Sequence, residues 1–294
     1  MKVVWLDFNL PRMGIARLFG ASNRHAYWGP LSPLRYGDRP EPALPGPAWV
    51  RCKTLLGGIC GSDIATIMLR QPASSILRPY VSYPMLLGHE SVAEVVEVGG
   101  EVDRTWLGKR VCVEPTLACR QRGIEPPCPA CAAGRFGQCQ NLSRATETLP
   151  AGMSIGYNSR TGGAWGESFV AHVSQLVAVP EAIDNDTAIL VDPLSCAMHG
   201  TLRANVGDDE QVLVVGAGVI GLGVVASLRA LGCNARIIVD ARHDFQAEAA
   251  VRVGANQTIN SGRPGSADRY ETLAEYAGTR VVKGLLGSRV LAGG

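Results

Sequence analysis

The sequence predicts two domains of different fold class, a β-rich domain over residues 1–180 and an α/β domain over residues 181–294. Three observations support this division. The chain has 294 residues, which is about the length at which one hydrophobic core gives way to two. Short apolar runs separated by Gly and Pro fill the first part, whereas strand-like and helix-like runs alternate in the second. The pattern changes close to Pro180.

The first domain is expected to be a barrel-like or sandwich structure, because many short strands with frequent turns are typical of such folds. The predicted strands cover residues 49–54, 91–98, 110–113, 168–172 and 176–179. Residues 115–165 lack apolar periodicity and are rich in Gly, Pro and Cys. We therefore expect a loop excursion there that needs something other than a core to hold it.

The second domain alternates strands with helices, which predicts a parallel sheet with right-handed crossovers. A helix is expected over residues 185–204, with a fresh start at Asp192-Pro193. The following strands and helices are expected over residues 211–215, 219–231, 235–239, 244–253 and 257–260, in the order strand, helix, strand, helix, strand.

Composition and charge exclude several classes of function. Apolar residues make up 46% of the chain and charged residues 18%, which indicates a globular protein with a sizeable core. The net charge of +2, with no basic run, argues against nucleic acid and anionic membranes as partners. The first residues, MKVVWLDFNLPR, lack the features of a signal peptide, and no apolar run could span a bilayer. We expect a cytoplasmic protein that acts on a small molecule.

A glycine-rich turn follows the predicted strand 211–215 and opens the next helix. It contains Gly216, Gly218, Val219, Ile220 and Gly221 in the order GAGVIG. The first glycine permits a tight turn, the second lets the backbone approach a pyrophosphate, and the third allows close packing of helix on sheet. The helix N-terminus then supplies N–H groups and a favourable dipole for phosphates. The turn predicts a dinucleotide site.

Asp240 lies 19 residues beyond Gly221, at the end of the next strand. A carboxylate there accepts hydrogen bonds from the adenosine ribose and repels a 2′-phosphate, which favours NAD over NADP. Arg242 would accommodate that phosphate, so NADP remains an alternative. A βαβ unit that binds no nucleotide is the other interpretation.

Two segments of the β-rich domain carry residues suited to a catalytic metal, GGICGSD at 57–63 and GHE at 88–90. A thiolate from Cys60 and an imidazole from His89 are good zinc ligands, and a catalytic zinc keeps one position open. Taken singly, Cys60 could be a small buried hydrophobe and His89 a structural residue. Glu90 and His89 would diverge on a strand but could converge on a turn.

Asp192 has two interpretations in the segment LVDPLSCAMH at 190–199. It is a further candidate for the metal site. Asp before Pro is also a common helix start, with the Asp as N-cap and Pro193 at the first helical position. Spacing alone favours the cap. Cys196 and His199 are interpreted as packing residues.

Four cysteines fall in the loop region 115–145: Cys119, Cys128, Cys131 and Cys139. The chain has nine cysteines and no secretion signal, so clustered cysteines predict metal binding rather than disulfides. Four thiolates complete a closed site for a structural zinc, which would supply the folding energy that this loop lacks. Unbound thiols are the alternative. The lack of basic residues argues against a zinc ribbon that binds nucleic acid.

Taken in order, GGICGSD, GHE, the cysteine-rich lobe, DPLSCAMH and VLVVGAGVIG resemble the zinc-containing medium-chain dehydrogenase/reductase family. The likeness is to its polyol and threonine dehydrogenase-like branch and runs from about residue 49 onward. It implies a GroES-like catalytic domain over residues 1–180 and a Rossmann domain over 181–294, with a catalytic zinc in the cleft between them. It also implies a homodimer or homotetramer.

The resemblance implies a role for individual residues. Cys60 and His89 match the cysteine and histidine ligands of the catalytic zinc. Glu90 matches a glutamate that ligates the metal or exchanges with water, and Asp192 takes an acidic position that is usually Glu in this branch. Ser62 matches the hydroxyl that relays the alcohol proton, and the four lobe cysteines match a structural zinc site.

Three local features depart from the pattern of the family. Asp192 is shorter than Glu, which puts direct ligation in question. Eight residues separate Cys119 from Cys128 where the family usually has two, and the interval from Cys60 to Gly88 is long, which indicates an altered substrate loop.

The family's nucleotide-binding sheet continues further than this sequence does. Residues 266–294 offer no candidate for the nicotinamide-side strands. We therefore expect an incomplete Rossmann domain that exposes apolar edges, with poor stability or dependence on a partner.

The expected reaction is reversible hydride transfer between an alcohol, polyol or hydroxy amino acid and NAD or NADP, with zinc at both metal sites. The alternative is a truncated, catalytically inactive scaffold or binding protein of the same family, stabilised by zinc. A zinc-free quinone reductase relative would require the Cys60 and His89 motifs to be accidental.

Overall fold

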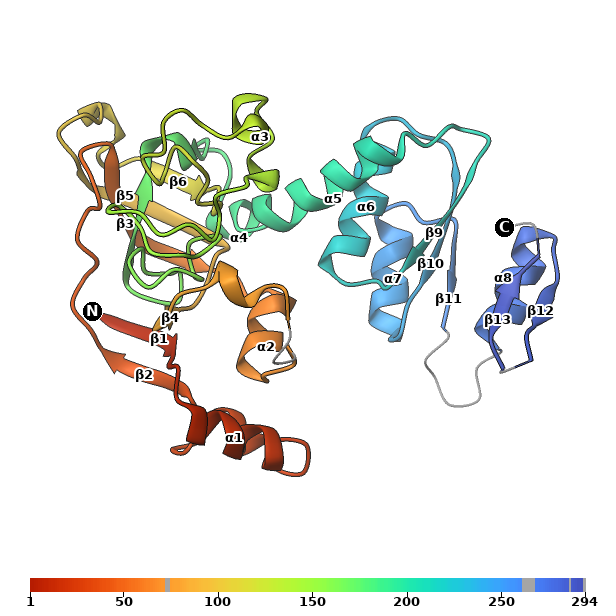
Figure 1. Ribbon diagram of the computed structural model, residues 1–294. Helices are drawn as coiled ribbons and strands as arrows, with labels where there is room; N and C mark the ends of the chain where they lie inside the picture. The colour runs from red at the N-terminus through yellow and green to blue at the C-terminus, as the bar shows by residue number, and fades with distance from the viewer. Residues whose placement is uncertain (72–74, 261–267, 286, 293–294) are drawn as a thin grey trace. The chain divides into compact units, whose positions relative to one another are not determined.

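The chain is described by a computed structural model, which covers residues 1–71, 75–260, 268–285 and 287–292 (Figure 1). It divides into two compact units, unit 1 over Met1–Asp192 and unit 2 over Pro193–Gly294. The sequence pattern places the change of fold class earlier, near residue 180. No helix in the described part of the chain is long and apolar enough to cross a membrane.

Unit 1 is built on a five-stranded antiparallel sheet (Figure 1). Its strands are β3 (Trp49–Gly57), β5 (Ser91–Val98), β6 (Arg110–Val113), β7 (Ser168–His172) and β8 (Leu176–Ala178), in the order β7-β3-β5-β6-β8. All five are predicted strands. Their buried residues, such as Val50, Ala93, Val95 and Phe169, form the main core of the unit. Burying each of the large ones stabilises the fold by about 1.5–3 kcal/mol.

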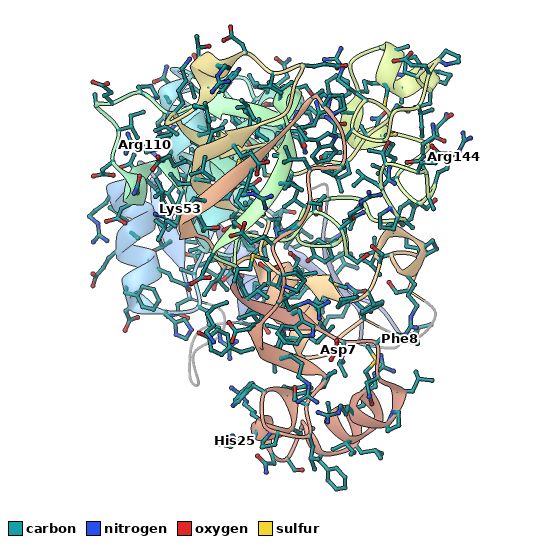
Figure 2. The ribbon with its side chains drawn as sticks, turned by 90° about the vertical axis from the view of Figure 1, so that its left-hand side faces the viewer. Asp7, Phe8, His25, Lys53, Arg110 and Arg144 are labelled. Carbon is teal, nitrogen blue, oxygen red and sulfur yellow. The ribbon has the colours of Figure 1, made fainter. Side chains whose placement is uncertain are left out.

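The first 38 residues add a second sheet and a helix that the sequence pattern does not predict. The elements are β1 (Lys2–Leu6), α1 (Leu10–Phe19), the 3-10 helix η1 (Arg24–Tyr27), β2 (Leu34–Asp38) and, from later in the chain, β4 (Met85–Leu86). Strand β1 pairs with β2 and β4 in antiparallel fashion. Helix α1 begins after Asn9, whose side chain accepts the Arg12 N–H at 3.1 Å. Figure 2 shows Asp7 and Phe8 where the sheet gives way to α1.

The remaining helices of unit 1 are short. They are α2 (Gly61–Ile67), η2 (Arg78–Tyr80), η3 (Arg104–Trp106), α3 (Pro129–Ala132), η4 (Phe136–Gln138), η5 (Val173–Gln175) and α4 (Asn185–Ala188). Only α3 and η4 interrupt the irregular chain of residues 115–165, which confirms the predicted loop excursion.

Arg122 holds that irregular region together. Its side chain is 1% exposed. It donates hydrogen bonds to the backbone carbonyls of Leu117, Leu142, Arg144, Pro150 and Gly152. Burial lowers the pKa of the guanidinium, while the nearby lobe cysteines oppose that effect. One side chain therefore satisfies carbonyls that would otherwise be buried without partners.

Unit 2 contains the predicted parallel sheet. Its elements are α5 (Val191–Ala204), which starts in unit 1, β9 (Gln211–Val215), α6 (Val219–Ala230), β10 (Arg236–Asp240), α7 (Asp244–Arg252), β11 (Gln257–Ile259), α8 (Arg269–Ala277), β12 (Val281–Lys283) and β13 (Arg289–Leu291). The order β11-β10-β9 is parallel throughout and confirms two βαβ crossovers. Strands β12 and β13 form a separate antiparallel hairpin rather than continuing this sheet.

The edge of this sheet is apolar. Strand β9 is an edge strand, and Leu213 and Val215 on it are 41% and 66% exposed. Apolar side chains are therefore exposed along this edge of the sheet.

The predicted helix over 185–204 is two helices, α4 and α5. Helix α5 begins at Val191, so Asp192 lies inside its first turn. The predicted N-cap position of Asp192 is therefore wrong, although its carboxylate still benefits from the helix dipole. Pro193 is buried in the same turn, where its missing N–H costs no helical hydrogen bond.

We expect Arg122→Met to lower the free energy of unfolding by about 3–5 kcal/mol, because the substitution leaves buried carbonyls without donors. Urea denaturation measures the loss. The exposed neighbour Arg120 provides the control, since Arg120→Met leaves those carbonyls paired. Equal stability of the two variants would contradict the role of Arg122.

Candidate active site

Cys60 is held by the start of α2. It occupies the N-cap position, and Asp63 three residues later closes a capping box with it. Asp63 Oδ2 accepts the Cys60 N–H at 3.0 Å. A carboxylate in the first turn is also favoured by the helix dipole. The box fixes the direction of the Cys60 thiol and leaves Asp63 completely buried.

His89 and Glu90 lie on an irregular segment between β4 and β5, which lets neighbouring side chains converge. Gly88 before them has φ +94°, and a Cβ there would lie 2.5 Å from the Trp165 ring. Trp165 Nε1 in turn donates to the Gly58 carbonyl at 2.8 Å. Only glycine fits this turn, because both the backbone conformation and the close contact exclude a side chain.

A second close approach holds Glu90 beside the same loop. The Gly58 N–H donates to the Glu90 carbonyl at 3.0 Å, and a Cβ on Gly58 would lie 2.1 Å from Glu90 Oε2. The result is a group of three potential metal ligands. One ligand atom each from Cys60, His89 and Glu90 lie within 4.8 Å of one another.

Asp63 also faces the imidazole of His89. His89 Nδ1 lies 3.4 Å from Asp63 Oδ1, and both atoms are buried without a hydrogen-bond partner. Burial opposes the charged imidazole, but Asp63 and then Cys60 outweigh it and raise the pKa of His89 to about 9. With Nδ1 turned toward a carboxylate, Nε2 is the nitrogen left for a metal. Carboxylate–histidine pairs of this kind orient metal-binding imidazoles, so the donor set fits a zinc ion.

The sequence reasoning missed Asp63. It lies in the quoted GGICGSD segment, and the available signal was its spacing of three residues from Cys60, the spacing of a capping box. Its second contact, to His89, depends on the fold and could not be read from spacing.

Asp192 is close to this group but is not part of it. Among the described residues, the ligand atoms that lie within 4.8 Å of one another do not include its carboxylate. Burial raises the pKa of Asp192, with His89 opposing that effect. Burial also raises the pKa of Glu90, and Asp192 adds to the increase. Two carboxyl groups with raised pKa values therefore lie near the imidazole of His89.

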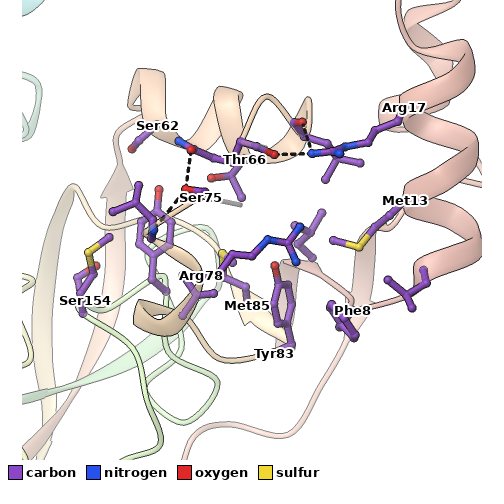
Figure 3. A pocket seen from close by; sticks show the side chains of 18 of the residues that line it. Phe8, Met13, Arg17, Ser62, Thr66, Ser75, Arg78, Tyr83, Met85 and Ser154 are labelled. Carbon is purple, nitrogen blue, oxygen red and sulfur yellow. Dashed lines mark hydrogen bonds between the residues drawn. The ribbon is translucent and has the colours of Figure 1, made fainter. Parts of the chain in front are cut away.

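A cavity of about 590 Å³ borders the group. Ser62, His89 and Tyr157 line it together, and Ser62 is exposed (Figure 3). The rings of His89 and Tyr157 are 5.7 Å apart. Burial raises the pKa of Tyr157, while the nearby side chains of Ser62 and Thr66 act against that effect. An exposed hydroxyl that lines the cavity beside the metal-ligand group is suited to moving a proton.

The four lobe cysteines also come together. One sulfur each from Cys119, Cys128, Cys131 and Cys139 lie within 4.8 Å of one another, so the long spacing after Cys119 does not prevent convergence. Backbone N–H groups point at the sulfurs, such as Asn141 N–H to Cys139 at 3.3 Å. Backbone N–H donors, chiefly that of Gln140, lower the pKa of Cys128 to about 6.

The glycine-rich turn of unit 2 lines a second cavity, of about 440 Å³. Gly216 has φ +97°, and a Cβ on Gly221 would lie 1.9 Å from the Gly216 carbonyl oxygen. Gly218 and Asp240 line the cavity, and Val219 and Ile220 follow at the start of α6. Arg242 lines it as well. These are features of a phosphate-binding turn at a helix N-terminus.

Asp240 has a partner that the sequence did not predict. Its carboxylate is 6% exposed and lies 2.9 Å from the guanidinium of Arg269, which comes from α8. Arg269 lines the same cavity. The charge of Asp240 is therefore partly compensated at the position where a ribose diol would bind.

The sequence is similar to proteins of known family. Residues 46–181 match the alcohol dehydrogenase GroES-like domain. Sorbitol dehydrogenase 1 of Saccharomyces cerevisiae is 32% identical over 81% of this chain and 60% of its own length. L-galactonate-5-dehydrogenase of Escherichia coli is 34% identical over 66% of this chain and 49% of its own length.

A comparison with solved structures also finds a dehydrogenase. A short chain alcohol dehydrogenase from Escherichia coli CFT073, complexed with NADH, superimposes with a TM-score of 0.66 at 29% identity, over 85% of this chain and 64% of that one. The fold is a GroES-like domain followed by a Rossmann-like sheet. The match and these relatives support placing the chain with the zinc-containing medium-chain dehydrogenase/reductase family, in its alcohol and polyol dehydrogenase-like part. It spans about 60% or less of the length of these curated relatives.

We expect His89 to make the metal-free protein less stable as the pH rises. A pKa raised from 6.5 to about 9 contributes stability that is complete below 6.5 and is lost as the pH passes through about 9. Unfolding of metal-free protein at several pH values measures this slope, and His89→Gln should remove it.

The lowered pKa of Cys128 acts with the opposite sign in the same pH range, so the difference between wild type and variant is the informative quantity. A His89→Gln profile parallel to that of the wild type would contradict the prediction.

Proposed function

We propose that this chain is a zinc-dependent oxidoreductase that transfers a hydride between an alcohol, a polyol or a hydroxy amino acid and NAD or NADP. The observation that carries the proposal is the group of Cys60, His89 and Glu90 beside a cavity that Ser62 also lines. The named relatives are dehydrogenases of polyols and sugar acids, which supports the substrate class.

Cys60 and His89 would hold the catalytic zinc, with Glu90 as a third ligand and Asp192 as a further candidate for ligation. A zinc ion bound there lowers the pKa of an alcohol and stabilises negative charge on its oxygen. Asp63 faces Nδ1 of His89, which would leave Nε2 as the nitrogen that holds the metal. Ser62 lines the cavity and is placed to take the alcohol proton.

Cys119, Cys128, Cys131 and Cys139 would hold a structural zinc. The support is their convergence and the N–H groups that face their sulfurs, which favour thiolates. A four-sulfur site has no open position for substrate, so its role is to stabilise the lobe.

The turn at Gly216, Gly218 and Gly221 would bind the cofactor pyrophosphate, with Val219 and Ile220 at the helix start supplying N–H groups. A nicotinamide cofactor accepts or donates the hydride. Asp240 remains the candidate for the ribose hydroxyls. Arg242 and Arg269 place two guanidinium groups on the same cavity, which supports acceptance of NADP as well as NAD.

The match at residues 46–181 supports a catalytic domain over 1–180. The parallel sheet and the glycine-rich turn that follows β9 support a nucleotide-binding domain over 181–294. A homodimer or homotetramer is the proposed assembly where the C-terminal part of the family is present. Cytoplasmic location is supported by the four clustered lobe thiols, because thiolate ligands persist in a reducing compartment.

Metal content and NAD(H) titration of the purified chain test the function together. We expect two zinc ions per chain and saturable NAD(H) binding. The inactive scaffold predicts one zinc and no nucleotide binding. Cys60→Ser should leave one zinc and lower alcohol oxidation by more than about 100-fold, because a metal contributes several kcal/mol to such a reaction. Cys196→Ser is the matched control at an exposed thiol. Full activity of Cys60→Ser would refute the assigned site.

The cofactor preference is predicted to depend on Arg269. Arg269→Gln removes the cation beside Asp240, so NADPH should bind about 10-fold less tightly relative to NADH. Fluorescence titration with both cofactors measures the ratio. Arg252→Gln on α7 is the control, because Arg252 pairs with Glu248 and does not line the cavity. An unchanged ratio in Arg269→Gln would exclude this role.

A further inference from the structure

The cavity beside the candidate active site has a wall that lies outside the matched GroES-like domain. Phe8, Met13 and Arg17 line it, and they precede the first matched residue, 46 (Figure 3). Helix α1 is fixed in place, because Arg17 donates to the carbonyls of Leu69 and Gln71 after α2. The wall is therefore a built part of the cavity rather than a loose end of the chain.

The charges that line the cavity are cationic. Arg17 and Arg78 both contribute to its surface, and the described residues that line it include no Asp or Glu. The sequence of residues 72–74, which follow the lining residue Gln71, is Pro-Ala-Ser and adds no charge. Guanidinium groups on a concave surface with apolar walls raise the local concentration of anions.

Arg78 is the arginine whose guanidinium N–H groups are available to a ligand. It opens η2, and its side chain reaches across the cavity toward Tyr83 and Met13 (Figure 3). Arg17, in contrast, donates hydrogen bonds from Nη2 to two backbone carbonyls. The backbone N–H of Arg78 donates to the Ser75 carbonyl at 3.2 Å, but its guanidinium forms no hydrogen bond or ion pair with any residue that the structure describes. A guanidinium with free N–H groups binds carboxylate or phosphate through paired hydrogen bonds.

Neighbouring carboxylates do not compete for it. Asp7, the acidic residue beside Phe8, accepts a hydrogen bond from Trp5 Nε1 at 2.8 Å and lies 3.8 Å from Arg35. Asp63 is buried behind His89.

We propose that Arg78, supported by Arg17, forms an anion subsite in this cavity, and that the substrate is an alcohol carrying a carboxylate or a phosphate. The proposed subsite rests on the proposed function, because the reacting hydroxyl is assumed to bind at the end of the cavity that Ser62 and His89 line. Phe8 and Met13 would then contact the carbon chain between the two ends. A cavity of about 590 Å³ is large enough for such a molecule.

The test is calorimetric binding to the zinc-loaded full chain without nucleotide, so that it does not depend on hydride transfer. The probes are matched sets on four-, five- and six-carbon polyols, each set comprising the neutral polyol, its aldonate and its terminal phosphate. The variants are wild type, Arg78→Met and Arg104→Met. Arg104 is the matched control because it opens the 3-10 helix η3 on the surface, as Arg78 opens η2.

We expect at least one aldonate or phosphate to bind wild type about 10-fold or more tightly than its neutral polyol, as charge-assisted hydrogen bonds are worth that much. Arg78→Met should remove this advantage and leave the neutral polyol unchanged, while Arg104→Met should have no effect. An advantage confined to aldonates or to phosphates identifies the anion.

Any of three results would overturn the subsite. Neutral polyols could bind as tightly as the anions, the anions could keep their advantage in Arg78→Met, or no anion could bind at all. Loss of alcohol oxidation with the binding pattern intact would instead count against the proposed function alone.

Discussion

The carboxylate of Asp63 is the constraint on which the candidate active site depends. One oxygen accepts the Cys60 N–H and starts α2, and the other faces His89 from a segment 26 residues later in the chain. A buried charge is tolerated only where it has such partners. The same side chain therefore sets the direction of the thiol, the orientation of the imidazole and the raised pKa of His89.

The two parts of unit 1 are stabilised in different ways. The antiparallel sheet is held by buried apolar side chains on β3, β5 and β7, as in any β-rich core. The lobe has little apolar surface, so its backbone is held by the polar contacts of Arg122 and by the four converging cysteines. A metal on those cysteines and the guanidinium of Arg122 act on adjacent parts of one loop, which makes the stability of the lobe sensitive to both.

The two cavities can be compared by the charged residues that line them. Each is lined by a pair of arginines, Arg17 and Arg78 in unit 1 and Arg242 and Arg269 in unit 2. Among the described lining residues, a carboxylate, that of Asp240, is found only in the cavity of unit 2. This difference makes the first cavity the more strongly cationic and leaves the second able to contact both hydroxyl and phosphate groups.

The sequence by itself determined the features that depend on local patterns. Short apolar runs between Gly and Pro predicted the five strands of the main sheet, glycine spacing predicted the turn at 216–221, and the clustered cysteines predicted the lobe. Only the tertiary structure decided the rest. The contact of Asp63 with His89, the pairing of Asp240 with Arg269 and the wall supplied by α1 join residues far apart in the chain, and periodicity carries no information on such contacts. Asp192 is a further example. Its position before Pro193 suits a helix cap, but the fold places its carboxylate near His89 and Glu90, which the local sequence could not predict.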